Sequence, residues 1–459
     1  MNILYLIKYA VRGIKSIDQW AELSFYKNSF SRDFDIKGYN VKGIYGANGA
    51  GKTAIISSVQ ILKNLIQNAS YLSESYVQSE LQEMINKTLE TLEISVDYLS
   101  PINNQMLLYR YQIVLKKNKE NKYSIAGESL SCRSALSHGE KMVIVFSVEN
   151  GSIASLREGE GIRERIVDNT RNLLTYASFC PTYFRTLFLN HPEDDNTKNP
   201  QWFLNQLTID CAILNVFGGA LVVSTDLADS HVDHYIYDKL IFQNEESNSD
   251  EKLRQMLVYI SQMKNNPNYM MSSGNITVLR DRYHEFEEEV KQLLRFIRVF
   301  KSDIQDIEID KREDKETFIC RLVMVYEGYR VHAEFESTGI KKLIRLFSSF
   351  KNMVNGGIVF IDELDSNLHD VYLCALLEYL MEYGEGQLCF TTHNIGPMDV
   401  LKKNKKSIDF LSVDHKIYSW TTSGNYSPSK LYRNGMIEGS PFNVDSIDFI
   451  GVFERSEES

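Results

Sequence analysis

The chain has 459 residues, of which 43% are hydrophobic and 24% are charged, with 25 glycines and 8 prolines. These values are typical of a globular protein with a large core and exclude a disordered or fibrous chain. The net charge of −11 argues against a general nucleic-acid coat. No stretch approaches the roughly 18 consecutive apolar residues of a membrane span, and the first residues lack the order of a signal peptide. We therefore expect a cytoplasmic protein that does not contact a membrane.

The first part of the chain, residues 1–135, predicts the N-terminal half of an α/β core. Apolar, β-prone runs at 2–10 and 39–45 predict two strands, and a helix is expected from Lys52 onward. Between 91 and 130, three segments alternate in strand fashion and are separated by Asn and Lys clusters. This pattern predicts antiparallel hairpins.

In residues 136–316 helical periodicity dominates. This pattern predicts a mostly helical insertion that splits the core. The clearest helix is expected over Ile276–Phe300, where apolar residues recur at alternating spacings of 3 and 4. This pattern leaves two interpretations open, a coiled-coil or oligomerisation helix and an amphipathic helix packed on its own domain. His231 and His234 form the one close histidine pair, which suits a metal site or a structural role.

Residues 317–459 return to an alternation of strands and helices and predict the second half of the core. Strands are expected at 317–326, 329–335, 356–361 and 387–392, and helices at 340–350 and 372–383. The chain has six cysteines, with no zinc-ligand spacing. They are predicted to be reduced and mostly buried.

A glycine-rich loop at Gly46–Thr53 fits the pattern G-x-x-x-x-G-K-[ST] and lies between a predicted strand and a predicted helix. Glycines let backbone N–H groups turn inward around phosphate oxygens, and a helix N-terminus favours the same anion. The predicted ATP-binding residues of the loop are Gly46, Asn48, Gly49, Gly51, Lys52 and Thr53. The Lys52 ammonium is expected to reach the β- and γ-phosphates, and the Thr53 hydroxyl to hold Mg²⁺.

A second motif is an apolar run, Gly357–Ile361, that ends in Asp362 and Glu363. A continuous apolar run predicts a strand buried on both faces, and ligands of α/β sheets bind at the carboxyl ends of such strands. Asp362 suits a position linked to Mg²⁺, and Glu363 suits a general base that orients the attacking water.

Two further candidates flank these carboxylates in sequence. His393 closes the predicted strand at 387–392 and is expected to hydrogen-bond the γ-phosphate or the catalytic water. Ser337, in the sequence Glu-Ser-Thr-Gly-Ile-Lys-Lys, opens a predicted helix. Ser, Thr and Gly at a helix start form either an N-cap or an anion site.

Together the four motifs resemble the ATPase head of the ABC superfamily. The loop at 46–53 resembles its Walker A motif, the strand before Asp362 its Walker B motif, and His393 its switch histidine. The resemblance makes Glu363 the catalytic acid and places Asp365 in the D-loop. Ser337 and Gly339 match the signature motif of this superfamily, whereas Thr338 and Ile340 depart from it.

With these departures, the signature of the chain resembles that of a group of prokaryotic ABC-type ATPases found in antiphage and abortive-infection systems. This group includes the OLD family, the Septu ATPase PtuA, the PARIS ATPase AriA and the AbiL or RloA type. Its serine-x-glycine-x-lysine signature matches Ser337, Gly339 and Lys341, and its D-E-x-x-x-x-L-H stretch matches Asp362 to His369. The resemblance covers roughly residues 1–130 and 317–400.

The resemblance implies a composite site. Heads of this class pair head-to-tail around two ATP molecules, so Ser337 and Gly339 of one head would reach the γ-phosphate held by Lys52 of the other. Lys341 would add positive charge there. A homodimer or larger homo-oligomer is therefore expected. Neither Gln201 nor Gln206 marks a Q-loop at a strand-to-helix junction.

The 66 residues after His393 lack a glutamate-plus-DxD set, so no nuclease is expected in this chain. The resemblance instead implies a sensor or scaffold ATPase that controls a separate effector of the TOPRIM or HNH nuclease type, with a phage protein as trigger. The first alternative is a RecF-like repair clamp that binds DNA, for which the basic runs at 116–119 and 402–406 are candidates. A transporter nucleotide-binding subunit is the second, against which the altered signature and the insertion argue.

Overall fold

The fold is that of a computed structural model of the chain. The structure describes residues 4–27, 30, 37–102, 105–137, 139–157, 160–170, 172–190, 205–225, 271–314, 317–404, 406–421 and 426–440. His231, His234 and Gln201 lie outside the described residues. In the described part of the chain, no helix is long and apolar enough to cross a membrane.

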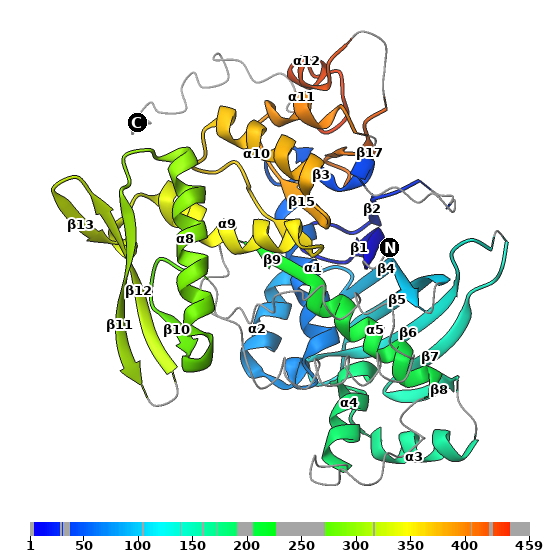
Figure 1. The fold of residues 1–459 in the computed structure, drawn as a ribbon. Coiled ribbons are helices and arrows are strands. Elements are labelled where there is room, and N and C mark those ends of the chain that lie inside the picture. The colour runs from blue at the N-terminus through cyan, green and yellow to red at the C-terminus, as the bar shows by residue number, and fades with distance from the viewer. Residues whose placement is uncertain are drawn as a thin grey trace, which may run out of the picture.

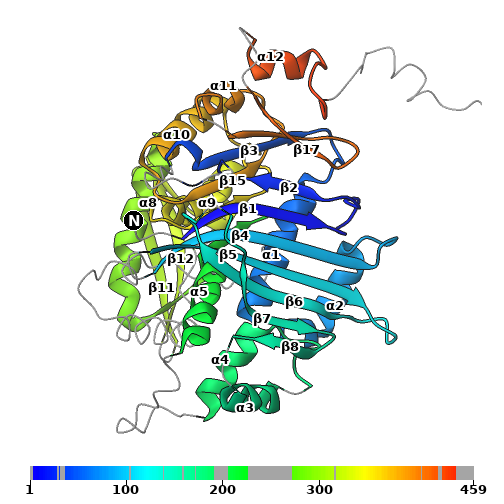
Figure 2. The same ribbon diagram turned by 90° about the vertical axis from the view of Figure 1, so that its right-hand side faces the viewer.

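A seven-stranded antiparallel sheet forms one side of the molecule, and Figure 2 shows its strands lying side by side. In spatial order its strands are β2 (Ala21–Ser24), β1 (Tyr5–Arg12), β4 (Thr91–Ile102), β5 (Gln105–Lys117), β6 (Tyr123–Ser134), β7 (Val143–Glu149) and β8 (Ser152–Leu156). The predicted strand at 2–10 and the hairpins between 91 and 130 are confirmed.

A second, six-stranded sheet lies at the centre of the molecule (Figure 1). In spatial order it contains β17 (Ile417–Ser419), β16 (Ile408–Leu411), β3 (Val41–Gly46), β15 (Gln387–Thr391), β14 (Ile358–Ile361) and β9 (Leu221–Ser224). All neighbours are parallel except β17, which pairs with β16 in the antiparallel direction. The carboxyl ends of β3, β15, β14 and β9 therefore meet at one edge.

Helices cover both faces of the six-stranded sheet. One face shares a core with α1 (Lys52–Gln67), α4 (Phe179–Asn190), α5 (Gln206–Ala220) and the seven-stranded sheet. The other face packs against α9 (Thr338–Val354), α10 (Asp370–Tyr383) and α11 (Pro397–Leu401). Among the described residues, the remaining α-helices outside the third sheet are α2 (Ser75–Met84), α3 (Glu160–Thr170) and α12 (Pro428–Arg433). This layered arrangement confirms the predicted α/β fold.

One buried side chain joins the two large sheets. The amide of Gln387 on β15 donates to the carbonyl oxygen of Leu6 at 2.9 Å, and its oxygen accepts from the Leu6 N–H at 2.6 Å. Leu6 lies on β1, so Gln387 satisfies both of its backbone polar groups as a neighbouring strand would. The contact fixes β1 against the central sheet.

A third, four-stranded sheet forms a separate layer with α8 (Tyr283–Phe300) at the side of the molecule (Figure 1). Its strands are β10 (Ile276–Leu279), β11 (Asp306–Asp314), β12 (Thr317–Tyr326) and β13 (Tyr329–His332). The 3₁₀ turns of the described chain are η1 (Lys37–Tyr39), η2 (Tyr71–Ser73), η4 (Arg280–Arg282) and η5 (Ala333–Phe335).

The expected helix over 276–300 is corrected by this layer. Ile276–Leu279 form a strand, and the helix begins only at Tyr283. Its apolar side chains, including Phe286 and Val290, are buried against the chain's own sheet. The regular spacing of 3 and 4 therefore spans two elements, and its helical part is the amphipathic face of an ordinary packed helix.

Residues 136–316 contain more helix than strand in their described part, but they do not form a body apart from the core. β7 and β8 extend the seven-stranded sheet, and β9 is part of the central sheet. The expected boundary at 135/136 falls between two paired strands, β6 and β7. The boundary at 316/317 falls between β11 and β12, which also pair. Long-range strand pairing, which helical periodicity does not reveal, produces this difference.

All six cysteines are free thiols. Five are buried and the sixth, Cys374, is partly buried. Burial raises the pKa of Cys320 to about 11. The prediction of mostly buried thiols is confirmed.

Candidate nucleotide-binding site

The loop at Gly46–Thr53 connects the end of β3 to the start of α1. Its backbone path requires glycine at two positions. A Cβ at Gly46 would lie 2.5 Å from the carbonyl oxygen of Leu411, and Gly51 has a φ of 107°, which L-residues rarely adopt. Because α1 begins directly after Gly51, its first N–H groups face the same space, which favours a bound anion.

Lys52 folds back over its own loop. Its Nζ donates to the carbonyl oxygens of Gly46 at 2.8 Å and Ala47 at 3.1 Å. The side chain is only 6% exposed. Burial lowers the pKa of Lys52, and the carboxylates of Asp362 and Glu363 oppose that shift. The ammonium is thus already held between the loop and the acidic strand end.

Asp362 and Glu363 follow β14, which lies between β15 and β9. The N–H of Asp362 continues the parallel ladder by donating to the Ser224 carbonyl oxygen at 2.9 Å. Asp362 is buried, whereas Glu363 is exposed. Glu363 has a φ of 47°, a left-handed conformation that is uncommon for a residue with a Cβ. Strained backbone of this kind concentrates at functional sites.

Thr391, at the end of β15, connects these two carboxylate residues. Its hydroxyl accepts from the N–H of Glu363 at 2.8 Å and donates to Oδ1 of Asp362 at 2.5 Å. Thr391 is fully buried. The hydroxyl fixes both the left-handed turn and the orientation of the Asp362 carboxylate. The sequence gives no signal for this role, because a threonine in a strand is usually a packing residue.

His393 lies two residues beyond β15 and is exposed toward the same edge. A cleft of about 720 Å³ opens there. The predicted residues that line it are Asn48, Gly49, Gly51, Lys52, Thr53, Asp362, Glu363 and His393. The structure therefore brings the loop at 46–53 together with two motifs that lie more than 300 residues later in the sequence.

Lys15 and Ser16 also line the cleft, and the sequence did not predict them. They belong to the turn after β1, where Lys15 has a φ of 47°. Asn86 holds this turn by donating to the Lys15 carbonyl oxygen at 2.7 Å, and the Lys15 N–H donates to Met84 at 2.6 Å. A lysine after a strand is common, so only the tertiary structure assigns Lys15 to the cleft.

The loop at Gly46–Thr53 also has a contact with the turn between β16 and β17. Nδ1 of His415, in the turn between β16 and β17, lies 3.1 Å from the Ala50 carbonyl oxygen. Since a carbonyl oxygen only accepts, Nδ1 carries the proton in this contact. His415 was not predicted, because it lies far from the motifs in sequence.

The signature residues do not line this cleft. Ser337 caps α9, and its hydroxyl accepts from the Ile340 N–H at 3.4 Å. A Cβ at Gly339 would lie 3.0 Å from the Asn367 carbonyl oxygen, so the start of α9 packs closely on the segment after Glu363. Nζ of Lys341 donates to the Glu334 carbonyl oxygen at 3.3 Å.

Asp365 lies in the turn that links Glu363 to α10. The N–H of Leu368 donates to the Asp365 carbonyl oxygen at 3.1 Å. The partly buried Asp365 carboxylate has one oxygen, Oδ1, without a hydrogen-bond partner among the described residues. The buried Lys342 stabilises this turn from α9 by donating to the Glu363 carbonyl oxygen at 2.5 Å and to the Ser366 hydroxyl.

The donor set fits Mg²⁺ bound together with phosphate. Thr53 offers a hydroxyl and Asp362 a carboxylate in the same cleft. Mg²⁺ in nucleotide sites is bound by one or two such protein oxygens, with phosphate and water completing the shell. The described residues hold no cluster of three or more His, Cys, Asp or Glu that would bind a metal without a nucleotide.

The strand that neighbours β14 on its outer side is β9, which pairs Ser224 with Ile361.

Gln206 is one of the two glutamines that could have marked a Q-loop. It begins α5 and donates to Oδ1 of Asp210 at 3.0 Å. It does not line the cleft.

A family profile described as "AAA domain, putative AbiEii toxin, Type IV TA system" matches residues 244–399. The match includes Ser337, Asp362 and His393 but not the loop at 46–53. The matched residues are thus similar to an AAA-type ATPase domain. A solved structure titled as the recombination mediator protein RecF in the RecFOR pathway shares 12% identity, with 92% of this chain and 99% of that chain covered and a TM-score of 0.39. No curated protein matches.

Proposed function

We propose that this chain binds and hydrolyses ATP in the cleft between its phosphate loop and the end of β14. The observation that carries the proposal is the convergence of Lys52, Asp362, Glu363 and His393 on one cleft of about 720 Å³. A cation and loop N–H groups face a base and a histidine there. This arrangement suits phosphoryl transfer to water.

Each residue has a distinct role in this proposal. Lys52 exchanges its contacts with Gly46 and Ala47 for the β- and γ-phosphates, while the amides of Gly49 and Gly51 hold phosphate oxygens. Thr53 and Asp362 would hold Mg²⁺, which supplies charge neutralisation when bound. Glu363 orients the attacking water and accepts its proton.

The position of His393 beside Glu363 in the cleft suits a hydrogen bond to the γ-phosphate or the water.

The active unit is a homodimer or larger homo-oligomer. Ser337, Gly339 and Lys341 lie at the start of α9 and do not line the cleft of their own chain. Ser337 is exposed, so a second chain can approach it. In the proposed assembly this helix start faces the γ-phosphate bound by Lys52 of the partner, as an anion site at a helix N-terminus.

The proposed biological role is that of a sensor or scaffold in antiphage defence, which controls a separate effector of the TOPRIM or HNH nuclease type after a phage protein triggers it. The support comes from the serine-x-glycine-x-lysine signature and the D-E-x-x-x-x-L-H stretch. The family description matched over 244–399, which names a toxin and a TA system, agrees with it.

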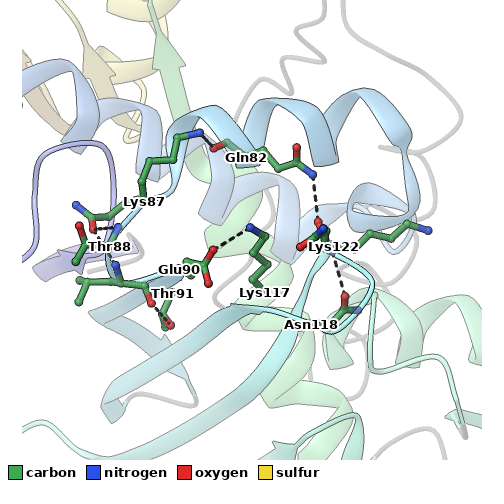
Figure 3. A network of polar contacts seen from close by, with 11 residues as sticks. Gln82, Lys87, Thr88, Glu90, Thr91, Lys117, Asn118 and Lys122 are labelled. Carbon is green, nitrogen blue, oxygen red and sulfur yellow. Dashed lines mark hydrogen bonds and ion pairs between the residues drawn. The ribbon is translucent and has the colours of Figure 1, made fainter.

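The RecF-like alternative requires a DNA-binding surface, and part of the charge of both basic runs is already paired within the chain. Asn118 closes the turn after β5, and Lys117 pairs with Glu90 at 2.8 Å (Figure 3). In the second run, Lys402 pairs with Asp399 at 2.9 Å. Paired lysines release few counterions on binding a phosphate backbone.

The decisive experiment combines two variants. Tagged Glu363→Gln protein, expressed with its neighbouring genes, is purified with ATP and its native mass measured. Removing the base leaves the phosphate contacts intact, so we expect an ATP-bound multimer that carries a second polypeptide. Lys52→Ala is the matched control and should bind no ATP.

A dimer that carries no second polypeptide and retains DNA would refute the defence role and support the repair-clamp alternative. Hydrolysis by Glu363→Gln at the wild-type rate would refute the catalytic assignment. Association of the second polypeptide with Lys52→Ala as strongly as with Glu363→Gln would refute control by nucleotide.

A further inference from the structure

One face of α10 carries an exposed apolar stripe. Val371, Ala375, Tyr379 and Tyr383 follow one another at intervals of four residues and are all exposed. The exposed fraction is 67% for Val371 and 57% for Tyr383. Residues spaced in this way lie on one side of a helix. Large apolar side chains gathered on one exposed face mark an interaction surface.

The flank of this stripe is acidic. Glu378 and Glu382 are both exposed on α10, and the helix contains no lysine or arginine. These two carboxylates line a hollow of about 560 Å³ beside the helix, together with Lys37 and Lys403. Glu378 pairs with Lys403 at 2.6 Å, so Glu382 is the carboxylate best placed for an outside cation. The surface calls for a partner with apolar and basic side chains.

The chain itself carries a surface of that kind around α12. Tyr426 and Met436 are 61% and 69% exposed, and Lys430 and Arg433 are exposed between them. Neither cation forms an ion pair with another of the described residues. This second surface carries two exposed cations, opposite in charge to the carboxylates of α10, together with two exposed apolar side chains and the exposed Glu438.

Both surfaces lie at the same end of the molecule. α10 packs on α11, and α11 packs on α12. Figures 1 and 2, which view the molecule at right angles, both place the three helices at this end. Two copies related by a two-fold axis could therefore make the same contact twice, which is the usual form of a homodimer interface.

We propose that two copies of this chain pair through a two-fold interface in which the α10 face of each copy packs on the α12 surface of the other. Val371, Tyr379 and Tyr383 supply the apolar contact. Glu382 of one copy faces Lys430 and Arg433 of the other. The contact needs no nucleotide and uses neither the cleft nor the start of α9, so it stands apart from the ATP-bridged pairing proposed above.

The consequence for function is an oligomer of more than two chains. An ATP-bridged contact at one surface and a constitutive contact at another join more than two chains. α10 also starts beside the cleft, because Asn394, next to His393, donates to Oδ1 of Asp370 at 2.9 Å. The proposed interface thus lies on a helix that is tied to the nucleotide site.

The test measures the mass of full-length, nucleotide-free protein by sedimentation velocity at micromolar concentrations. Wild type is expected to be a dimer. Glu382→Lys, and separately Lys430→Glu with Arg433→Glu, should each weaken self-association about tenfold or more by placing like charges together. Tyr329→Lys, which changes an exposed tyrosine on β13, is the matched control and should leave the dimer intact.

Mixing the two charge variants gives the sharper result. One variant retains an intact α12 surface and the other an intact α10 face, so the mixture should recover dimers that neither forms alone. A chain that carries all three reversals should also dimerise, because its charges are again opposite.

Three outcomes would overturn the proposal: monomeric wild type, charge variants that remain dimeric, or an open ladder of masses in place of a dimer. Repeating the measurement with Lys52→Ala separates the two proposals. That variant lacks the ATP-bridged contact and should still dimerise.

Discussion

Replacing Thr391 by valine removes one hydroxyl and keeps the volume of the side chain. In the structure this hydroxyl has two contacts, with the N–H of Glu363 at 2.8 Å and with Oδ1 of Asp362 at 2.5 Å. Valine would leave the N–H without its acceptor and the carboxylate without a donor. The left-handed conformation of Glu363 would lose one of its restraints and keep the contact of its carbonyl oxygen with Lys342.

The magnitude follows from these contacts. A hydrogen bond to a charged group contributes about 1.5–3 kcal/mol, and a factor of ten in rate corresponds to about 1.4 kcal/mol. If the contact with Asp362 acts fully in the transition state, kcat/KM for ATP should fall about ten- to a hundredfold. Because Lys52 and the loop are untouched, the dissociation constant for ATP should change much less.

The assay is steady-state ATP hydrolysis together with nucleotide binding, at a temperature where unfolding is absent. The matched control is Thr208→Val in α5. Thr208 is also fully buried, and its hydroxyl also has two partners, Asn205 at 2.8 Å and Tyr183 at 2.8 Å. Both variants should lose stability, but only Thr391→Val should lose turnover.

Unchanged kcat/KM in a folded Thr391→Val protein would refute this reasoning. An equal loss of turnover in both variants would assign the effect to stability. A loss confined to ATP binding would mean that Thr391 supports the loop and not the carboxylates.

Three further predictions concern other parts of the molecule. Lys15→Ala should weaken ATP binding about three- to tenfold in a fluorescent-nucleotide titration, because it removes a cation from the cleft; an unchanged dissociation constant would exclude the contact. Burial raises the pKa of Glu128 from 4.5 to about 7, so the free energy of unfolding should fall by up to about 3 kcal/mol as the pH rises through that interval. Urea unfolding at about pH 5 and about pH 8 should show this fall in wild type but not in Glu128→Gln. Ser337→Ala should hydrolyse ATP poorly alone and regain activity when mixed with Lys52→Ala; no recovery would argue against a composite site.

The sequence predicts the parts of the site that are local strand-to-loop motifs. Each of the three motifs lies at the end of a buried strand: Gly46–Thr53 begins with the last residue of β3, Asp362 and Glu363 follow β14, and His393 lies two residues beyond β15. Parallel strands place their carboxyl ends at one edge of a sheet, so three such motifs meet there whatever their separation in the chain. This rule explains why the residues predicted from the three motifs line the same cleft.

The residues that the sequence missed depend on tertiary contacts. Thr391, Lys15 and His415 act through neighbours that are distant in the chain, and nothing in their immediate sequence marks them. The pattern over 276–300 misled for a related reason. Ile276 and Leu279 are three residues apart and so continue the spacing of α8, although the short strand β10 buries Ile276 and Val278. Periodicity alone therefore did not show where the strand ended.

The segment from Glu363 to Asp370 is the physical link between the cleft and the two surfaces proposed to meet other chains. Lys342 ties it to α9 through the Glu363 carbonyl oxygen and Ser366, and Gly339 packs on Asn367. At its far end the segment becomes α10. A nucleotide that reorients Glu363 must therefore act on a turn that is packed against the start of α9 and continuous with α10. Since close-packed contacts of this kind shift together and do not stretch, nucleotide occupancy has a direct mechanical route to both surfaces.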